Sequence, residues 1–509
     1  MSGILQSGPT ERARRVVGSM LVFLIISGIG FEASATDLPP AVVRTLERFD
    51  LSEKGLSVRI EALNSGDAVL DHQSTLALNP ASTMKLVTTY AALSSLSPGH
   101  TWSTDVFLLG EVDEAGVLSG DLALRGGGDP YLVAETLWQL LTELRRRGIQ
   151  KIDGDIIFDT SFFEIPVEDP AAFDNEPLRA YNVSPDALLV NFKVIRFFFE
   201  PDESNNTVRV TTLPELENLD IDNQLKLVRG RCRGYLRGIR IDAETNGERV
   251  RFSGNFPSGC KRYSLGRTLL SHQAYAFGLI ARQWSLLGGE LTGGYQSAQV
   301  ADTEEPFLSW RSRPFSEVIR LINKHSNNVM TRQVFLTLGA HYFGAPATVE
   351  KARRAIDAWA LDQSLSLDNL VIDNGAGLSR EARMTATEMV GLLQHAWRSP
   401  FMPEFVSSLS LVGTDGTFRR RHKSGMLTGR AHLKTGRLDD VTALAGYMTA
   451  RNGQRYALSI LHNDKGVHRG GGEAVQDAIL RWLYTHDQTA SIPRAAKGIA
   501  ASQSKEVAP

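Results

Sequence analysis

The chain has 509 residues, of which 42% are hydrophobic and 22% charged, and its formal net charge is −2. Because one hydrophobic core rarely covers so long a chain, the sequence predicts several domains. The composition is that of an ordinary globular protein, and the nearly neutral charge balance argues against a nucleic-acid partner.

The N-terminal segment has the pattern of a secretory signal peptide. Three arginines within residues 12–15 precede a mostly apolar run over residues 16–31, and the small residues 33–35 form a cleavage site. Such a segment directs export and is then removed, although an uncleaved anchor is the alternative. We therefore expect residues 1–35 to be a signal peptide, and the mature protein to be periplasmic with no integral membrane span.

The mature chain begins with strands and a helix. Residues 56–63 alternate apolar and polar side chains, residues 64–67 form a turn, and residues 68–72 return as a second strand. This pattern predicts a β-hairpin. A helix from Ser82 to about Ser95 follows it.

The pattern of the sequence changes over residues 99–264. Short β-like runs alternate there with turn residues, and one helix is predicted over residues 134–147. We expect this span to be an inserted β-rich region of two nested subdomains. Residues 36–98 and 265–487 would then form one domain. Its N- and C-terminal strands would share an antiparallel sheet, with a final helix on one face and a helical cluster on the other. The polar residues 488–509 are expected to be a disordered tail.

The two cysteines, Cys232 and Cys260, lie in the inserted region. In an exported protein they could form a disulfide, and the alternative is two separate thiols. Two cysteines cannot form a zinc site by themselves, so no metal site is predicted.

The first candidate catalytic pair is Ser82 and Lys85. A serine and a lysine three residues apart lie on one face of a helix, where a desolvated lysine can take the proton of a nucleophilic hydroxyl. The same spacing occurs at Ser258–Lys261 and Ser502–Lys505. Proline and glycine flank Ser258, and Ser502 lies in the polar tail, so only Ser82 begins a long helix.

The second candidate is Ser326-Asn327-Asn328, between two amphipathic helices. A hydroxyl there could relay a proton, and the Asn328 amide could hold a substrate carbonyl. A simple helix cap by Ser326 or Asn327 is the alternative. Similar Ser-x-Asn triplets at Ser204 and Ser253 have the composition of hairpin turns.

The third candidate is Lys434-Thr435-Gly436, at the start of a predicted hairpin. A cation and a hydroxyl beside a residue without a side chain suit a carboxylate-bearing substrate that pairs along the strand. The alternative is a solvated lysine at a strand end. Lys423-Ser424-Gly425 has a similar pattern but lies in a loop rich in arginine and glycine.

The basic cluster Arg419-Arg420-Arg421-His422-Lys423 is the densest run of positive charge in the chain. A solvated loop is the interpretation that we favour, and contact with an anionic polymer is the alternative.

The three motifs in this order resemble the set shared by penicillin-binding proteins and serine β-lactamases. The long insertion after the first motif and several further segments resemble the D-alanyl-D-alanine carboxypeptidase/endopeptidase family typified by penicillin-binding protein 4. These segments are residues 124–130, 373–380, 413–417 and 443–447. The resemblance implies an α+β fold, in which a penicillin-binding-protein/β-lactamase-like domain carries inserted β-rich domains.

The resemblance also implies roles for the motif residues. Ser82 would attack the carbonyl of the penultimate D-alanine of a peptidoglycan stem peptide, with Lys85 as general base and Ser326 as proton relay. Asn328, Lys434, Thr435, Gly436 and Arg437 would bind the substrate, the amides of Ser82 and Arg437 forming the oxyanion hole. β-Lactams would inhibit by acylating the same serine, and no metal or organic cofactor is implied.

Two other functions share the motifs. A serine β-lactamase is expected to be more compact than this chain, in which about 240 residues separate Lys85 from Ser326. A non-catalytic wall-binding or penicillin-sensing module would not need the complete set of acid–base residues. The sequence does not decide between trimming of terminal D-alanine and cleavage of cross-links, nor does it determine the oligomeric state.

Overall fold

The computed structural model describes residues 37–232, 238–243 and 247–486. The predicted signal peptide, residues 1–35, and the predicted tail, residues 488–509, lie outside the described residues. Within the described ranges, no helix is both long and apolar enough to cross a membrane.

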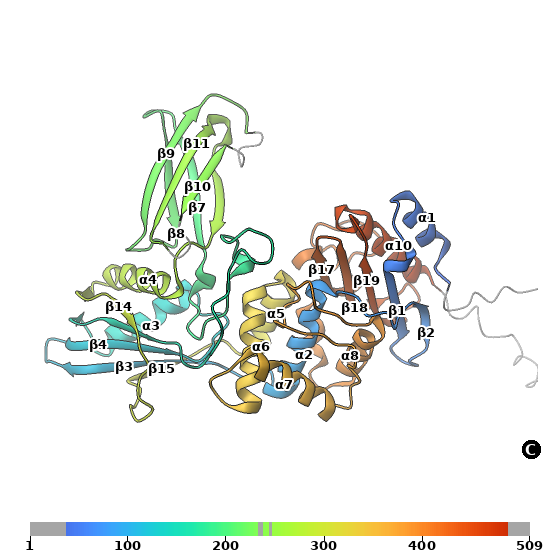
Figure 1. Ribbon diagram of the computed structural model, residues 1–509, viewed down its shortest axis with the longest axis horizontal. Coiled ribbons are helices and arrows are strands. Elements are labelled where there is room, and N and C mark those ends of the chain that lie inside the picture. The colour runs from blue at the N-terminus through green and yellow to red at the C-terminus, as the bar shows by residue number, and fades with distance from the viewer. Residues whose placement is uncertain (1–36, 233–237, 244–246, 487–509) are drawn as a thin grey trace, which may run out of the picture. The chain divides into compact units, whose positions relative to one another are not determined.

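A six-stranded antiparallel sheet joins the two ends of the described chain (Figure 1). In spatial order its strands are β16 (Ser410–Leu411), β17 (Ala431–Leu438), β18 (Val441–Thr449), β19 (Arg455–Asn463), β1 (Leu56–Ala62) and β2 (Ala68–His72). The hairpin predicted near residue 60 is β1 and β2, and β1 pairs with β19 along its whole length. The sheet predicted from N- and C-terminal strands is thereby confirmed.

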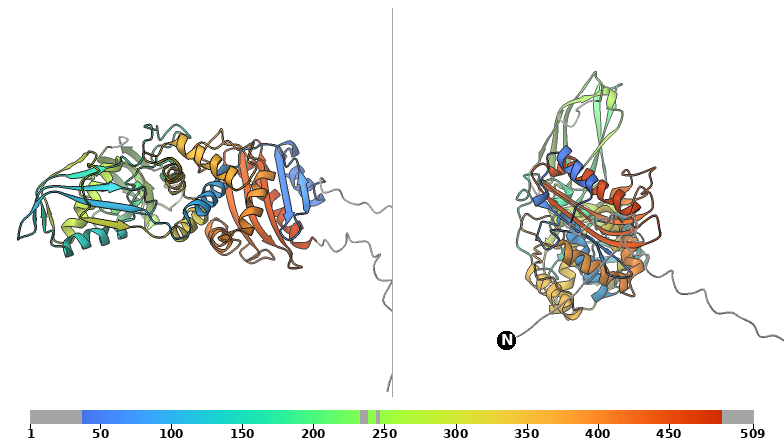
Figure 2. Two further views of the ribbon diagram at one scale, coloured as in Figure 1. Left: turned by 90° about the horizontal axis from the view of Figure 1, so that it is seen from below. Right: turned by 90° about the vertical axis from the view of Figure 1, so that its right-hand side faces the viewer.

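Helices cover both faces of this sheet (Figure 2). One face packs against α1 (Pro40–Arg48) and α10 (Gly471–Thr485). The other face packs against α2 (Lys85–Leu96), α5 (Phe315–His325), α6 (Asn328–Phe343), α7 (Val349–Asp362), α8 (Ala386–Arg398) and α9 (Met402–Ser408).

Alternation along β18 explains the two cores. Leu444 and Met448 point toward α1 and α10, whereas Ala445 and Tyr447 belong to the core of the helical cluster. Successive side chains of a strand point to opposite faces, so a strand that is apolar on both sides must be covered on both. β17 pairs with this doubly covered strand along its whole length.

The inserted region contains three further sheets (Figure 1). A seven-stranded sheet contains β3 (Ser103–Val112), β4 (Val117–Gly126), β5 (Lys151–Ile152), β6 (Ile156–Asp159), β13 (Glu290–Leu291), β14 (Tyr295–Ser297) and β15 (Leu308–Arg311). The helices α3 (Ala134–Arg146) and α4 (His272–Leu286) pack on it. Two three-stranded sheets follow: β7 (Ile195–Asp202), β8 (Thr207–Leu213) and β12 (Tyr263–Arg267), and β9 (Asp220–Val228), β10 (Ile239–Ala243) and β11 (Arg249–Pro257).

Short 3-10 turns connect several of these elements. They are η1 (Glu53–Gly55), η2 (Ala81–Met84), η3 (Ala180–Asn182), η4 (Asn191–Lys193), η6 (Ser258–Cys260), η7 (Gly416–Phe418) and η8 (Val467–Arg469). Cys232 and Cys260 form a disulfide, which decides between the two alternatives left open by the sequence.

The sequence predicts that the insertion ends at residue 264, and two elements beyond that residue pack or pair with the inserted sheets. α4 packs in the core of the inserted sheets, and β15 pairs with β3. The sequence could not show this, because an apolar helix face does not specify which sheet it covers. We propose that the insertion extends over residues 99–311.

Candidate active site

Ser82 lies in η2, the 3-10 turn that leads directly into α2. The residue before it, Ala81, has a φ of 44°, a conformation that is uncommon for residues other than glycine. Its amide donates to Asn79 Oδ1 at 2.8 Å, and Asn463 Oδ1 in turn accepts from the amide of Asn79 at 2.8 Å. The surrounding bonds thus hold a strained turn beside the serine, as often occurs at functional sites.

Lys85 is completely buried one turn after Ser82. Its Nζ donates to Ser82 Oγ at 3.0 Å, to Asn328 Oδ1 at 2.7 Å and to the carbonyl oxygen of Ala376 at 2.6 Å. Burial first, and then the positive charge of Lys434, lower the pKa of Lys85 well below its usual value. Desolvation disfavours the charged ammonium, so the neutral amine that a general base requires becomes accessible.

Ser326 ends α5 in the left-handed conformation, with a φ of 57°. The next residue, Asn327, caps α6 by accepting from the amide of Met330. The two interpretations of this motif, a helix cap and a functional serine, are therefore compatible, because Asn327 and not Ser326 forms the cap. Ser326 remains available, and its Oγ accepts from Lys434 Nζ at 2.8 Å.

Asn328 opens α6 and is buried. Its Oδ1 accepts from Lys85, and its Nδ2 donates to the carbonyl oxygen of Tyr181, in the inserted region, at 3.2 Å. Asn328 therefore connects the serine–lysine pair to the insertion.

Lys434 lies on β17 and is fully buried, and this burial lowers its pKa to about 7. Beyond it, Gly436 passes against η2: a Cβ at this position would lie 2.8 Å from the carbonyl oxygen of Pro80 and 3.0 Å from Ala81 Cβ. Only glycine allows the strand to approach the serine turn so closely. The predicted amides of Ser82 and Arg437 belong to these two adjoining segments, and the exposed Arg437 side chain pairs with Glu473 at 3.6 Å.

The structure therefore brings the predicted site residues together. Ser82, Lys85 and Asn328 form one hydrogen-bonded group, and Ser326 and Lys434 form a second. No hydrogen bond joins Ser326 Oγ to Ser82 or Lys85 among the described residues.

Three contacts were not anticipated from the sequence. They are the carbonyl of Ala376 on Lys85, the carbonyl of Tyr181 on Asn328, and the hydroxyl of Thr417, which lies 3.1 Å from Thr435 Oγ1. Every residue has a backbone carbonyl, so the sequence does not show which of them will accept a hydrogen bond. The only available signal for the first was the Asn-Gly-Ala-Gly pattern at residues 374–377.

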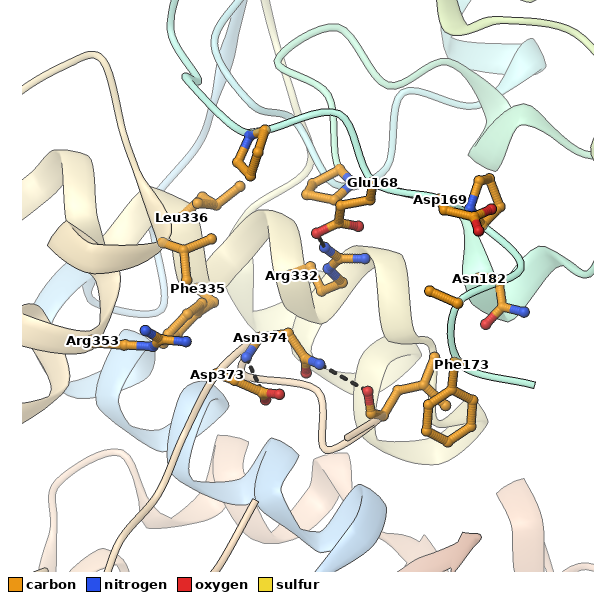
Figure 3. Close-up of a pocket in the computed structure, with 16 residues that line it drawn as sticks. Glu168, Asp169, Phe173, Asn182, Arg332, Phe335, Leu336, Arg353, Asp373 and Asn374 are labelled. Carbon is orange, nitrogen blue, oxygen red and sulfur yellow. Dashed lines mark hydrogen bonds and ion pairs between the residues drawn. The ribbon is translucent and has the colours of Figure 1, made fainter. Parts of the chain in front are cut away.

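Asn374 of that segment also lines a pocket of about 490 Å³ (Figure 3). Asn374 shapes the segment: its Oδ1 accepts from the amide of Ala376 and its Nδ2 donates to the carbonyl of Leu378, both at 2.9 Å. On the opposite wall of the pocket, Arg332 of α6 pairs with Glu168 of the insertion (Figure 3).

The family model for the D-Ala-D-Ala carboxypeptidase 3 (S13) family, Peptidase_S13, matches residues 41–486. The chain belongs to this family and is therefore a DD-peptidase with a penicillin-binding-protein fold.

Its relatives include the D-alanyl-D-alanine carboxypeptidase DacB of Haemophilus influenzae, which is 25% identical over 78% of this chain and 82% of the relative. The D-alanyl-D-alanine carboxypeptidase of Actinomadura sp. is 29% identical over 79% of this chain and 76% of the relative. Among solved structures, penicillin binding protein 4 of Haemophilus influenzae matches with a TM-score of 0.74 and 23% identity. That match covers 87% of this chain and 99% of the solved one.

Proposed function

We propose that this DD-peptidase hydrolyses peptidoglycan stem peptides through an acyl-enzyme on Ser82. The observation that carries this proposal is the burial of Lys85 with its Nζ 3.0 Å from Ser82 Oγ. A buried amine with a lowered pKa can accept the serine proton at neutral pH, which is what an activated nucleophile requires.

The first step is attack of Ser82 Oγ on the carbonyl carbon of the penultimate D-alanine, with transfer of the hydroxyl proton to Lys85 Nζ. The amides of Ser82 and Arg437 bind the oxyanion, and loss of one such donor typically costs about 3 kcal/mol of transition-state stabilisation. The tetrahedral intermediate then collapses and breaks the amide bond to the departing residue. The amine of that residue receives a proton through Ser326. Water finally hydrolyses the acyl-enzyme.

Lys434 and Thr435 bind the carboxylate of the departing residue, and Gly436 lets the substrate lie along β17. Buried Lys434 is held by Ser326 Oγ and the carbonyl of Thr435, both at 2.8 Å. Binding of a carboxylate would favour its charged form. Asn328, fixed between Lys85 and Tyr181, contacts the peptide.

β-Lactams would acylate the same serine, since they mimic the D-Ala-D-Ala dipeptide. A structure of penicillin binding protein 4 from Haemophilus influenzae, 23% identical with a TM-score of 0.70, is a complex with a β-lactam. The N-terminal pattern of residues 1–35 supports action in the periplasm, where the substrate lies.

The test is a β-lactam acylation assay followed by measurement of D-alanine release from a pentapeptide. Stable acylation together with D-alanine release is the expected result, and Ser82→Ala should abolish both in a protein that remains folded. Rapid β-lactam hydrolysis without peptide turnover would indicate a β-lactamase, and acylation without turnover of any peptide would indicate a sensing module. Digestion of purified cross-linked peptidoglycan, with the products identified by mass, would show which amide bond is cut.

A further inference from the structure

The loop before β17 carries four exposed basic side chains, and it begins beside Thr417, whose hydroxyl contacts Thr435. We call Arg419, Arg420, Lys423 and Arg430 the basic rim. We propose that the basic rim binds the carboxylates of the second stem peptide, the leaving group when a peptidoglycan cross-link is cut. This inference rests on the proposed function and makes the cross-link a preferred substrate.

The loop is fixed to the body of the protein by other residues. Arg421 donates to Asp477 Oδ1 at 2.8 Å and to Gln476 Oε1 at 3.0 Å on α10, and His422 Nε2 lies 2.7 Å from Asp477 Oδ1. Thr428 Oγ1 closes the loop by donating to the carbonyl of His422 at 2.6 Å. The anchors use one arginine and one histidine of the basic cluster and leave the basic rim free.

No side chain of the basic rim makes an ion pair or hydrogen bond with the residues that the structure describes. Other arginines are paired: the exposed Arg146 and Arg147 with Glu143, and the half-buried Arg282 with Glu215. The nearby carboxylate of Asp415 is already engaged by Lys324 at 2.6 Å. Because the whole chain carries a net charge of −2, four unpaired cations in twelve residues form a local positive field.

The start of this loop, which carries Arg419 and Arg420, adjoins the part of the site that would receive the leaving group, whereas Arg430 lies at its far end beside Thr449. Thr417, two residues before Arg419, lies with its Oγ1 3.1 Å from Thr435 Oγ1. A cavity of about 190 Å³ lined by Thr435, Gly436, Arg421 and Arg437 also opens here. A group attached to the carboxylate-bearing carbon at Thr435 can therefore extend onto this loop.

The two possible leaving groups differ in charge. Hydrolysis of a pentapeptide releases one D-alanine, whose single carboxylate is bound by Lys434 and Thr435. Hydrolysis of a cross-link breaks the equivalent amide bond, but the departing amine belongs to a stem peptide with several further carboxylates. Exposed ion pairs are individually weak, so the three made by Arg419, Arg420 and Lys423 should together favour the cross-link by about tenfold at low salt.

The experiment compares a triple variant, Arg419→Gln, Arg420→Gln and Lys423→Gln, with a matched control. The control, Arg44→Gln, Arg481→Gln and Lys54→Gln, removes the same charges from exposed side chains on α1, α10 and η1 that also lack ion pairs among the described residues. Values of kcat/KM are measured for a pentapeptide and for a cross-linked stem-peptide dimer. The dimer is also tested with the acceptor-stem carboxylates amidated.

For the triple variant we expect a loss of about tenfold on the dimer and less than twofold on the pentapeptide, and no change for the control. For wild type, kcat/KM on the dimer should fall by the same factor when the acceptor carboxylates are amidated or when the salt concentration is raised. For the triple variant, neither change should lower kcat/KM further. Equal losses on both substrates, no loss on the dimer, or failure of wild type to cut the dimer while it trims the pentapeptide would each overturn the inference.

The rate of β-lactam acylation separates this outcome from failure of the proposed function. Acylation does not involve the second stem peptide, so it should be the same in all three proteins. Wild type that neither acylates nor releases D-alanine would refute the proposed function itself. A lower kcat/KM on the dimer alone, with an unchanged acylation rate, would show that the variant affects binding of the second stem peptide, the leaving group.

Discussion

Gly377 offers a direct test of how the serine turn is held in place. It has a φ of 72°, and a Cβ at this position would overlap the carbonyl oxygen of Ala81 and lie 3.0 Å from Met84 Cβ. Ala81 precedes Ser82, and the carbonyl of Ala376 accepts the hydrogen bond from Lys85. The methyl group added by Gly377→Ala would therefore disturb the turn that holds Ser82 and the carbonyl that binds Lys85.

The expected effects follow from two separate costs. A left-handed backbone costs an alanine about 1–2 kcal/mol of stability. Overlap with a backbone atom cannot be relieved by a side-chain rotation, and overpacking of this kind costs about 1–3 kcal/mol more. The turn must also move, and a displacement of about 1 Å at the reacting atoms lowers the rate on the order of 10²-fold.

Gly66→Ala is the matched control. Gly66 has a φ of 78°, but a Cβ there would meet nothing within 4 Å. This variant should lose only the stability that a left-handed backbone costs an alanine, and it should acylate β-lactams at the wild-type rate. The assay is the acylation rate constant with a fluorescent penicillin, together with the free energy of unfolding in urea. A Gly377→Ala protein that acylates as fast as Gly66→Ala would show that the contact with Ala81 does not position the serine.

Three further predictions concern charge. Lys85→Arg should lower acylation by about 10²–10⁴-fold at every pH up to 9, because a guanidinium cannot give up its proton; for wild type, the rate should rise with pH through the lowered pKa of Lys85. Lys434→Ala should weaken substrates with a free terminal carboxylate more than amidated ones, and equal losses in kcat/KM would contradict its assigned role. Burial raises the pKa of Asp129 from 3.8 to about 6, so its neutral form stabilises the fold below pH 3.8, and about 3 kcal/mol is lost as pH rises through 6. Asp129→Asn, which can still accept from the Tyr131 amide, should flatten this pH dependence in thermal unfolding, and an unchanged profile would rule Asp129 out as its source.

Much of the fold followed from local patterns. The β1–β2 hairpin is as predicted, and the capping box of Thr385 and Glu388 at the start of α8 is a local pattern of the same kind. Such features depend on residues only a few positions apart, which is why periodicity and cap chemistry reveal them. Strand β9 is harder to predict, because its polar residues show little alternation. The extent that we propose for the insertion depends on the pairing of β15 with β3, which joins residues about 200 positions apart and leaves no local pattern.

From the sequence alone we predict which residues carry the chemistry, and we set aside similar spacings elsewhere because their local context does not suit a helix. The Ser258 spacing indeed lies in a short 3-10 turn rather than at a helix start. Folding adds two facts that no local pattern contains: Lys85 and Lys434 are both fully buried, and a backbone carbonyl 291 residues from Lys85 accepts a hydrogen bond from its Nζ. Burial and proximity depend on the whole packed molecule, and they are what change the proton affinity of a lysine from that of a surface cation to that of a base.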